Sequence, residues 1–435
     1  MVPYRHTYSI GCISLFLSLV LSAAVSLRGT SRSMQVVFDA LQIPQACPSW
    51  FAGRLWLLRL GYYKLMRSKV QAKDWVWIVD HTVQLGDDKC LVILGARLCD
   101  MASSADDCIS HADVEPIELV PVKKSNGEVV YQQLEQAIAK TGVPRAILSD
   151  HGTDLNAGVE KFCQQHPDTS AFYDIKHKTA ALLKREFNQD PDWNRFTQLA
   201  TQTKLKVQQT ALAALSPPNQ KTKARYMNVD ILVHWAQKML AFLDTPDAVR
   251  KPIFDAKTVE EKLGWVRSFR SQLKDWGELF EMLTAAESFI RHKGLYQGIH
   301  QELKAYLLPL QAQTERTQRL RRELMTFVAE QEAKVRPGER LFGSSEVIES
   351  VFGKMKRLEQ DQSKNGFTGL LLGLGALVST TSNAVIQTAL ETVSTKQVEL
   401  WCQKTLGQTV QSKRRQALAV ARFPEQIWNQ FLVPA

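Results

Sequence analysis

The chain has 435 residues, 45% of them hydrophobic and 23% charged, which is typical of a soluble globular protein. Its length exceeds what one simple core normally organises, so we expect about two to four domains. The excess of 54 Lys and Arg over 44 Asp and Glu gives a net charge of +10, which favours a polyanionic partner without identifying it. Seven scattered cysteines without a Cys-x-x-Cys pair indicate neither a zinc site nor a disulfide framework, and they fit a reducing compartment.

The N-terminal segment 10–27 is almost wholly apolar or small and follows Arg5. This pattern is shared by signal peptides and membrane segments. Ser14, Ser18, Ser22 and Ser26 recur every four residues, as a stripe of small polar groups on a packed helix also does. We expect a helix packed in a soluble domain, with the membrane or signal interpretation as the alternative.

A second apolar helix pattern covers 48–73, with Ser49 placed to cap it. Basic residues, among them Arg54, Arg59 and Lys64, are interleaved with the apolar ones. After a preceding helix and a turn at 42–47, this resembles a helix-turn-helix region whose second helix contacts duplex DNA. An amphipathic helix with a solvated basic face is an equally good interpretation.

The segment 73–195 follows a definite order of elements. Strands are predicted at 75–84, 90–97, 116–122, 145–150 and 169–175, and helices at 128–141, at 154–165 and from 176 onward. Three strands, then helix, strand, helix, strand and helix is the order of a ribonuclease-H-like fold. We therefore predict an α/β core in which a mixed five-stranded sheet is flanked by helices.

Two aspartates stand at strand ends in this core. Asp80 closes the buried pattern Trp-Val-Trp-Ile-Val-Asp, and Asp150 closes Ala-Ile-Leu-Ser-Asp. Alone, each is equally explained as a turn-initiating or capping residue. Together, on neighbouring strands, their like charges call for cations, and hard divalent ions with oxygen ligands are the natural solution. A metal pair of this kind activates water and stabilises the leaving oxygen of a phosphodiester.

A third carboxylate is expected from a helix predicted at 344–361. Helical geometry places Glu349 at the edge of the apolar face, whereas Glu346 points further toward solvent, so Glu349 is the better candidate. Lys356, two turns later, lies on nearly the same side. A merely solvated lysine is the alternative for Lys356.

The segment 196–340 is predicted to be helical throughout, as an insertion or separate domain, and 341–435 to carry the Glu349 helix and a C-terminal helical part. Within the insertion, Trp235, Trp265 and Trp276 stand among apolar residues at helical spacing, which indicates core positions. The apolar run 367–378 is too short to span a bilayer, and we expect a buried helical hairpin behind the active site.

The residues Ile-Val-Asp80-His-Thr, Leu-Ser-Asp150-His-Gly and Val-Ile-Glu349-Ser-Val-Phe-Gly-Lys-Met-Lys356 resemble those of a DDE transposase of a bacterial insertion sequence. The resemblance spans about 73–361 and accommodates the helical block as the insertion that many such families carry. It implies catalysis by Asp80, Asp150 and Glu349 holding two Mg²⁺ ions, with Mn²⁺ as the alternative metal.

Further residues carry the resemblance. Asp174-Ile-Lys-His177 is similar to the Asp-x-x-His pair of hAT and Mutator-like relatives, where the pair supports the active site, although a helix-capping hydrogen bond explains it as well. The spacing of Glu349 and Lys356 matches a Tyr-x2-Arg-x3-Glu-x6-Lys motif, but Phe342 and Ser345 replace its Tyr and Arg. His81 and His151 are candidates for DNA contacts or for hydrogen-bonding support.

The expected function is a cytoplasmic, nucleoid-associated DNA transposase that cleaves at its element's ends and transfers the 3′ hydroxyl into target DNA. The implied partners are the terminal inverted repeats and target DNA, bound by a dimer or a larger assembly, with no membrane. Residues 1–72 would bind DNA, and by resemblance the three tryptophans would stack on a flipped base or hairpin end. The alternatives are a structure-selective nuclease without strand transfer, or a non-catalytic DNA-binding or membrane-associated protein.

Overall fold

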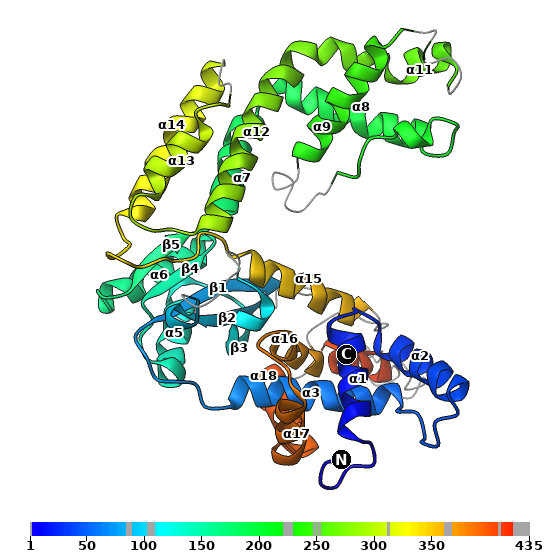
Figure 1. Ribbon diagram of the computed structural model, residues 1–435, viewed down its shortest axis with the longest axis vertical. Coiled ribbons are helices and arrows are strands. Elements are labelled where there is room, and N and C mark those ends of the chain that lie inside the picture. The colour runs from blue at the N-terminus through cyan, green and yellow to red at the C-terminus, as the bar shows by residue number, and fades with distance from the viewer. Residues whose placement is uncertain are drawn as a thin grey trace, which may run out of the picture. The chain divides into compact units, whose positions relative to one another are not determined.

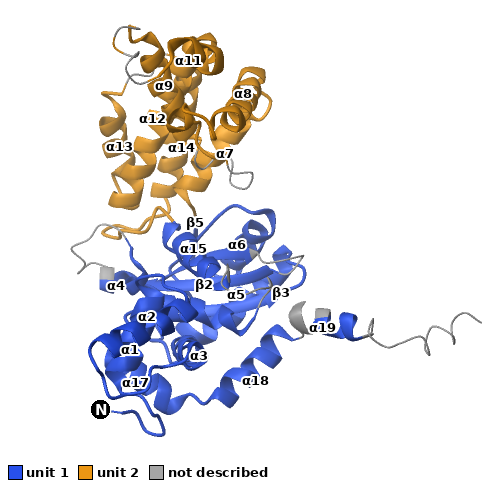
Figure 2. Ribbon diagram, turned by 90° about the vertical axis from the view of Figure 1, so that its right-hand side faces the viewer, with its two compact units in different colours: residues 1–172, 345–435 blue, residues 173–344 orange. Residues whose placement is uncertain are grey.

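The structure is a computed structural model that describes residues 2–83, 89–101, 109–220, 229–246, 249, 254–310, 314–360, 368–407 and 410–420. The chain forms two compact units: unit 1 comprises 1–172 and 345–435, and unit 2 comprises 173–344 (Figure 2). The chain thus leaves unit 1 after residue 172 and returns to it at residue 345. The helical block predicted at 196–340 lies wholly inside unit 2, which begins earlier than the prediction.

Unit 1 is built on the predicted mixed sheet, with the strand order β3-β2-β1-β4-β5 (Figure 1). The strands are β1 (Trp75–Val83), β2 (Lys89–Arg97), β3 (Glu115–Val122), β4 (Ala146–Ser149) and β5 (Ser170–Tyr173). β2 pairs antiparallel with both β1 and β3, whereas β4 pairs parallel with β1. The observed strand ends differ from the predicted ones by no more than two residues.

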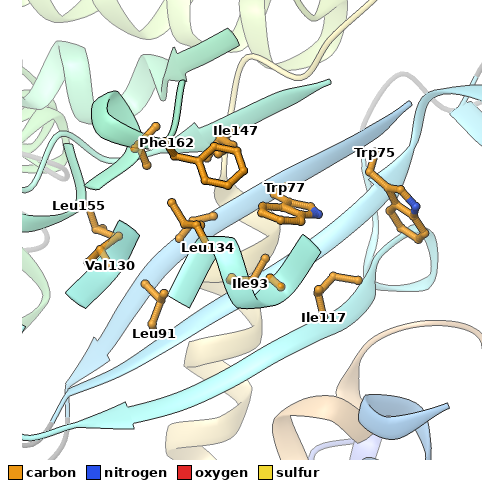
Figure 3. Close-up of a cluster of buried hydrophobic side chains, with 13 residues drawn as sticks. Trp75, Trp77, Leu91, Ile93, Ile117, Val130, Leu134, Ile147, Leu155 and Phe162 are labelled. Atoms are coloured by element: carbon orange, nitrogen blue, oxygen red, sulfur yellow. The ribbon is translucent and has the colours of Figure 1, made fainter. Parts of the chain in front are cut away.

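Both faces of the central strand are covered. On one face, Trp77 and Val79 pack with Phe162 of α6 (Thr153–Gln165) and Leu134 of α5 (Gly127–Thr141) in a fully buried cluster (Figure 3). Side chains alternate along a strand, so the neighbouring Ile78 belongs to the opposite face, and it too is fully buried. The absence of polar alternation in this segment of the sequence is explained by this double coverage.

The helices of unit 1 come from both ends of the chain. They are α1 (Ile10–Leu21), α2 (Leu27–Ala40), α3 (Trp50–Met66), α4 (Leu98–Met101), α15 (Glu346–Gln360), α16 (Leu372–Leu377), α17 (Asn383–Thr392), α18 (Thr395–Leu406) and α19 (Val410–Val420), besides α5 and α6. Unit 1 also contains two 3₁₀ turns: η1 (His111–Asp113) lies between α4 and β3, and η5 (Gly369–Leu371) lies between α15 and α16. α15 contacts β1, and α3 contacts β3, α16 and α17.

Helix α1 covers only the first part of the apolar N-terminal segment 10–27, and Ser22 and Ser26 of the predicted stripe lie outside it. α1 ends at Leu21, and Ser26 caps α2 by accepting a hydrogen bond from the amide of Gly29 at 2.9 Å. Phe16, Leu17 and Val20 of α1 are buried inside unit 1, as expected for a packed helix. Among the described residues, no helix is both long and apolar enough to cross a membrane.

A close crossing of α3 and α16 explains the glycines of the apolar C-terminal segment. A Cβ atom at Gly61 would overlap the backbone carbonyl of Leu372, and one at Gly375 would lie 2.8 Å from the carbonyl oxygen of Gly61. The two helices therefore approach backbone to backbone, which residues with side chains would prevent. In place of the predicted hairpin, the segment forms η5, α16 and α17, and both α16 and α17 contact α3.

Unit 2 is helical, with one isolated bridge between Leu295 and Leu341. Its helices are α7 (Ile175–Phe187), α8 (Pro191–Val207), α9 (Asp230–Asp244), α11 (Ala256–Leu263), α12 (Arg270–Lys293), α13 (Ile299–Leu307) and α14 (Glu315–Glu332), with 3₁₀ turns η2 (Ala213–Leu215) and η4 (Gly264–Phe269). Its core is aromatic: Trp193 and Trp276 pack edge to face with ring centroids 5.0 Å apart, beside Phe187 and Phe196. The prediction of an all-helical block is confirmed for the described part of this segment.

Candidate active site

Asp80 and Asp150 lie beside each other where the pairing of the parallel strands β1 and β4 ends. Asp150 directly follows β4, whereas β1 continues past Asp80 to Val83. The last registered pair of β1 and β4 is Val79 with Ser149, and one aspartate follows each of these residues. Neighbouring strands are about 4.8 Å apart, so the two aspartate backbones lie at roughly that distance. Both aspartates are half-buried. The structure thus brings together the first two predicted site residues.

The alternation of β1 determines which face Asp80 occupies. Val79 belongs to the cluster on the α5 and α6 face, so Asp80 belongs to the opposite face, as does Ile78. β1 contacts α15, the helix that carries Glu349 in its first turn. Glu349 is half-buried and Ile348 and Val351 beside it are fully buried, but Glu346 is half-buried as well, so burial does not separate the two glutamates.

Backbone amides position both aspartates. The amide of His81 donates to Asp80 Oδ1 at 2.6 Å, and the amide of Gly152 donates to Asp150 Oδ1 at 3.2 Å. These hydrogen bonds fix the orientation of each carboxylate. Within the described parts of the chain, no three His, Cys, Asp or Glu side chains are already grouped as a metal site.

A polar network supports the site from the opposite face of the sheet. The His81 side chain is only 7% exposed, with its Nδ1 3.9 Å from Asp154 Oδ2 and its Nε2 3.3 Å from Ser125 Oγ. Lys89 of β2 pairs with the same Asp154 oxygen at 3.0 Å. The network connects the end of β1, which carries Asp80, to the first turn of α6, which directly follows the Asp150 loop.

Burial and neighbouring charges shift the pKa values of His81 and Asp154 in this network. Burial lowers the pKa of His81, with Asp154 opposing that effect and Lys89 adding to it. For Asp154 burial alone would raise the pKa, but the Ser125 hydrogen bond, Lys89 and His81 lower it to about 2. Asp154 is therefore an anion at neutral pH, whereas His81 favours its neutral form.

The roles of Asp154, Ser125 and Lys89 were not anticipated from the sequence. Asp154 lies four residues after Asp150, at the start of a predicted helix, where an acidic residue is common for other reasons. Ser125 and Lys89 come from segments far apart in the chain. Only the spatial proximity of β2, α5 and α6 reveals the network.

Asp174 and His177 lie in unit 2, at the start of α7. Asp174 is buried and caps the helix, accepting a hydrogen bond from the backbone amide of His177 at 2.8 Å. This is the capping interaction that the sequence left open as the alternative to a supporting role. On α15 in unit 1, Lys356 is exposed, which agrees with a solvated lysine and leaves a contact with DNA as a prediction.

The structure corrects the DNA-binding role predicted for Lys64 and Arg59 of α3. Lys64 is fully buried, and its ammonium donates to the carbonyl oxygens of Val378 and Ser379 at 2.7 and 2.9 Å. Arg59 donates to Val393 O at 2.6 Å and also to Leu390 O.

Arg54 is half-buried and interacts electrostatically with Cys402 of α18, and burial lowers its pKa. The physical reason is coverage: α1, α2, α16, α17 and α18 all contact α3, so Lys64 and Arg59 bind carbonyl groups inside unit 1. These two side chains are therefore not presented to DNA in this conformation, whereas a DNA contact by Arg54 stays a prediction.

The tryptophans fit the core interpretation. Trp276 is 1% exposed within the aromatic core of unit 2, so its ring is not presented to a base in this conformation. Trp235 and Trp265 are half-buried, and their indole N–H groups donate to Leu215 O at 3.1 Å and Thr203 Oγ1 at 2.8 Å. Stacking on DNA by these two residues stays a prediction.

No family model matches the chain, and no curated protein matches it. Among solved structures, the Drosophila P element transposase strand transfer complex is similar, with a TM-score of 0.38 and 13% sequence identity over 91% of this chain and 94% of that chain. The likeness is a distant one, which assigns no residue of this chain.

Proposed function

We propose that the protein is a DNA transposase with a ribonuclease-H-like core, in which unit 2 is an all-helical insertion between the second Asp and the Glu. The observation that carries this proposal is the parallel register of β1 and β4. It sets Asp80 beside Asp150 on the sheet face that does not contact α5 and α6. The helix bearing Glu349 contacts the same strand, so all three carboxylates predicted from the sequence belong to elements that meet at β1.

The donor chemistry of these residues fits hard divalent cations. Two adjacent carboxylates repel each other unless cations share the site, and oxygen-only ligands suit Mg²⁺ or Mn²⁺. When bound by Asp80, Asp150 and Glu349, the metal ions would supply activation of water and neutralisation of the leaving oxygen. The chain's own contribution is to orient the two aspartates through the amides of His81 and Gly152.

The proposed reaction is cleavage at the ends of a DNA element, followed by attack of the released 3′ hydroxyl on target DNA. The net charge of +10 suits a polyanionic substrate. Because two ends must be joined to one target, the active form would be a dimer or a larger assembly. A basic surface on α15, including the exposed Lys356, is the proposed site for the DNA backbone beside the carboxylates.

The test uses the full-length protein, a donor plasmid in which the gene's native flanking DNA brackets a marker, and Mg²⁺. Asp150→Asn and Glu349→Gln should each reduce excision and joined products by roughly 10²–10³-fold. Glu346→Gln is the matched control, because it removes the same charge from the same first turn of α15. Glu346 is half-buried like Glu349, so this variant also tests the choice between the two glutamates, and it should retain activity within about threefold if Glu349 is the ligand.

Three results would count against the proposal. Equal loss with Glu346→Gln and Glu349→Gln would mean that charge on α15, not a specific ligand, matters. Full activity of Asp150→Asn would exclude the paired-aspartate site. Cleaved but never joined DNA would indicate the nuclease without strand transfer.

A further inference from the structure

A cavity in unit 1, distinct from the carboxylate site, has the chemistry of an anion-binding pocket. It measures about 320 Å³, is partly open to solvent, and is lined by residues of α1, η1, α15, α16, α17 and the connection between α16 and α17. This volume is at the lower end of the range of about 300–1,000 Å³ found for small-molecule sites. Leu21, Leu377 and Ile386 supply apolar walls, and Ser18, Ser22 and Thr380 supply hydroxyl groups.

Two nitrogen groups meet in this cavity. Lys354 of α15 donates to Nδ1 of His111 at 3.1 Å, and both side chains are half-buried. Burial and the nearby Lys354 charge lower the pKa of His111, so its imidazole is neutral and keeps an Nε2–H group as a further donor. Among the described residues, no carboxylate lines the cavity. Within the described part of the chain, the Lys354 ammonium is thus the charged group of the lining, and its positive charge favours an anion.

The connection between α16 and α17 forms one wall of the cavity, and its backbone is strained at Ser379. Ser379 has a φ of +55°, in the left-handed region that a residue with a side chain adopts only when its surroundings impose it. The surroundings do so here: the Ser379 amide donates to His111 O at 2.7 Å, and the ammonium of Lys64 binds Ser379 O at 2.9 Å. Arg67 Nη2 also lies 3.2 Å from Ser379 Oγ.

The charge behind this wall is positive. Lys64, Arg67 and Lys69 cluster around one carboxylate, Glu115, which pairs with Arg67 and lies 3.4 Å from Lys69. Arg67 pairs with this carboxylate, whereas burial lowers the pKa values of Lys64 and Lys69 to about 7 and about 8, so the cluster carries its full positive charge only below those values. At or below neutral pH the cluster therefore adds positive potential behind the cavity wall, which favours an anion.

We propose that this cavity binds a small organic anion, with a phosphate or carboxylate head at Lys354 and His111 and a short apolar body against Leu21, Leu377 and Ile386. The proposal is independent of transposase activity, because it rests on other residues. Alkyl phosphates and alkyl carboxylates are the ligand classes that combine both features. Inorganic phosphate would bind more weakly because it leaves the apolar walls in contact with water.

The first experiment is titration calorimetry of the full-length protein with n-hexyl phosphate, n-hexanoate and n-hexanol. The anions should bind at one site, and the neutral alcohol should bind at least about tenfold more weakly, because hydrogen bonds to a charged group are lost. Whichever anion binds more tightly identifies the preferred head group. Hexanol binding as tightly as both anions would overturn the proposal.

Two single substitutions on α15 test whether the anion binds in this cavity. Lys354→Met should weaken the binding of hexyl phosphate by about tenfold or more. Arg357→Met is the matched control, since it removes a positive charge from an exposed position of the same helix outside the cavity, and it should change the affinity by less than about twofold. Equal affinities of Lys354→Met and the wild type would overturn the assignment.

A measurement on the wild type covers the case in which Lys354→Met does not fold. Hexyl phosphate should slow the acetylation of Lys354 by a water-soluble reagent, read by mass spectrometry, while the exposed Lys356 reacts at an unchanged rate. Equal protection of both lysines, or of neither at millimolar ligand, would refute a defined site in the cavity.

Discussion

Lys64 is predicted to make the stability of unit 1 increase with pH in the alkaline range. Burial lowers its pKa to about 7, with the Arg67 charge acting in the same direction, whereas the lysine of an unfolded chain titrates near 10.5. Between these two values the unfolded chain carries a proton on Lys64 that the folded chain has released. Raising the pH therefore favours the folded state, and the cost of the buried cation is fully present below pH 7.

The size of this pH effect on stability depends on the interval between the two pKa values of Lys64, about 7 in the folded chain and 10.5 in the unfolded chain. The free energy of unfolding should rise by up to about 1.4 kcal/mol for each pH unit inside it, and by roughly 5 kcal/mol across all of it. From pH 7.5 to 9.5 the expected gain is about 2–3 kcal/mol. This gain is an upper estimate, because hydrogen bonds from the ammonium to Val378 O and Ser379 O favour the charged form.

The assay is urea unfolding followed by circular dichroism, with the wild type compared to Lys64→Met at several pH values. The difference between the two isolates the titration of Lys64 from that of the other groups. Lys396→Met, at an exposed position of α18, controls for the loss of one charge from unit 1. A difference between the wild type and Lys64→Met that stays constant from pH 7.5 to 9.5 would refute the reasoning.

Two further predictions concern the stability of unit 1. Asp154→Asn should cost about 1–2 kcal/mol at pH 7, because a carboxylate whose pKa is held at about 2 stabilises the fold above its ordinary pKa. That deficit should shrink as the pH falls from 4 toward 2 and the wild-type carboxylate gains its proton, and a deficit independent of pH in urea unfolding would contradict this account. Gly61→Ala should lower the free energy of unfolding by about 1–3 kcal/mol, because its Cβ would overlap the Leu372 carbonyl. Gly11→Ala on α1, where a Cβ meets nothing within 4 Å, should be neutral or stabilising, and equal melting temperatures of the two variants would argue against the close crossing of α3 and α16.

Local patterns in the sequence were sufficient for the elements of the core. The apolar run ending at Asp80 predicted a strand covered on both faces, and β1 is such a strand. Pattern and turn signals placed the five strands and most helices within a few residues, because periodicity and capping residues act over short distances in the chain. Helical geometry also placed Glu349 at the edge of the apolar face, where it is half-buried. The structure does not separate it from Glu346, which was expected to point further toward solvent and is half-buried too.

Long-range contacts decided what periodicity does not encode. α3 is apolar with interleaved cations, a pattern shared by a DNA-binding helix and by a buried helix whose cations bind carbonyl groups. The choice between them depended on α16, α17 and α18, whose residues follow α3 by about three hundred positions. The cavity at Lys354 and the network of His81 with Asp154 likewise join segments distant in the chain.

The register of β1 and β4 is another long-range property that periodicity in the sequence does not encode. Two strand-terminal aspartates were evident in the sequence, but only pairing between strands brings Val79 opposite Ser149 and so sets Asp80 beside Asp150. A shift of one residue would have sent one carboxylate to the opposite face of the sheet. The sequence alone thus determined the residue types and elements of the candidate site, whereas the tertiary structure decided which side chains share a face, because hydrogen bonding between strands and packing between distant helices set the register.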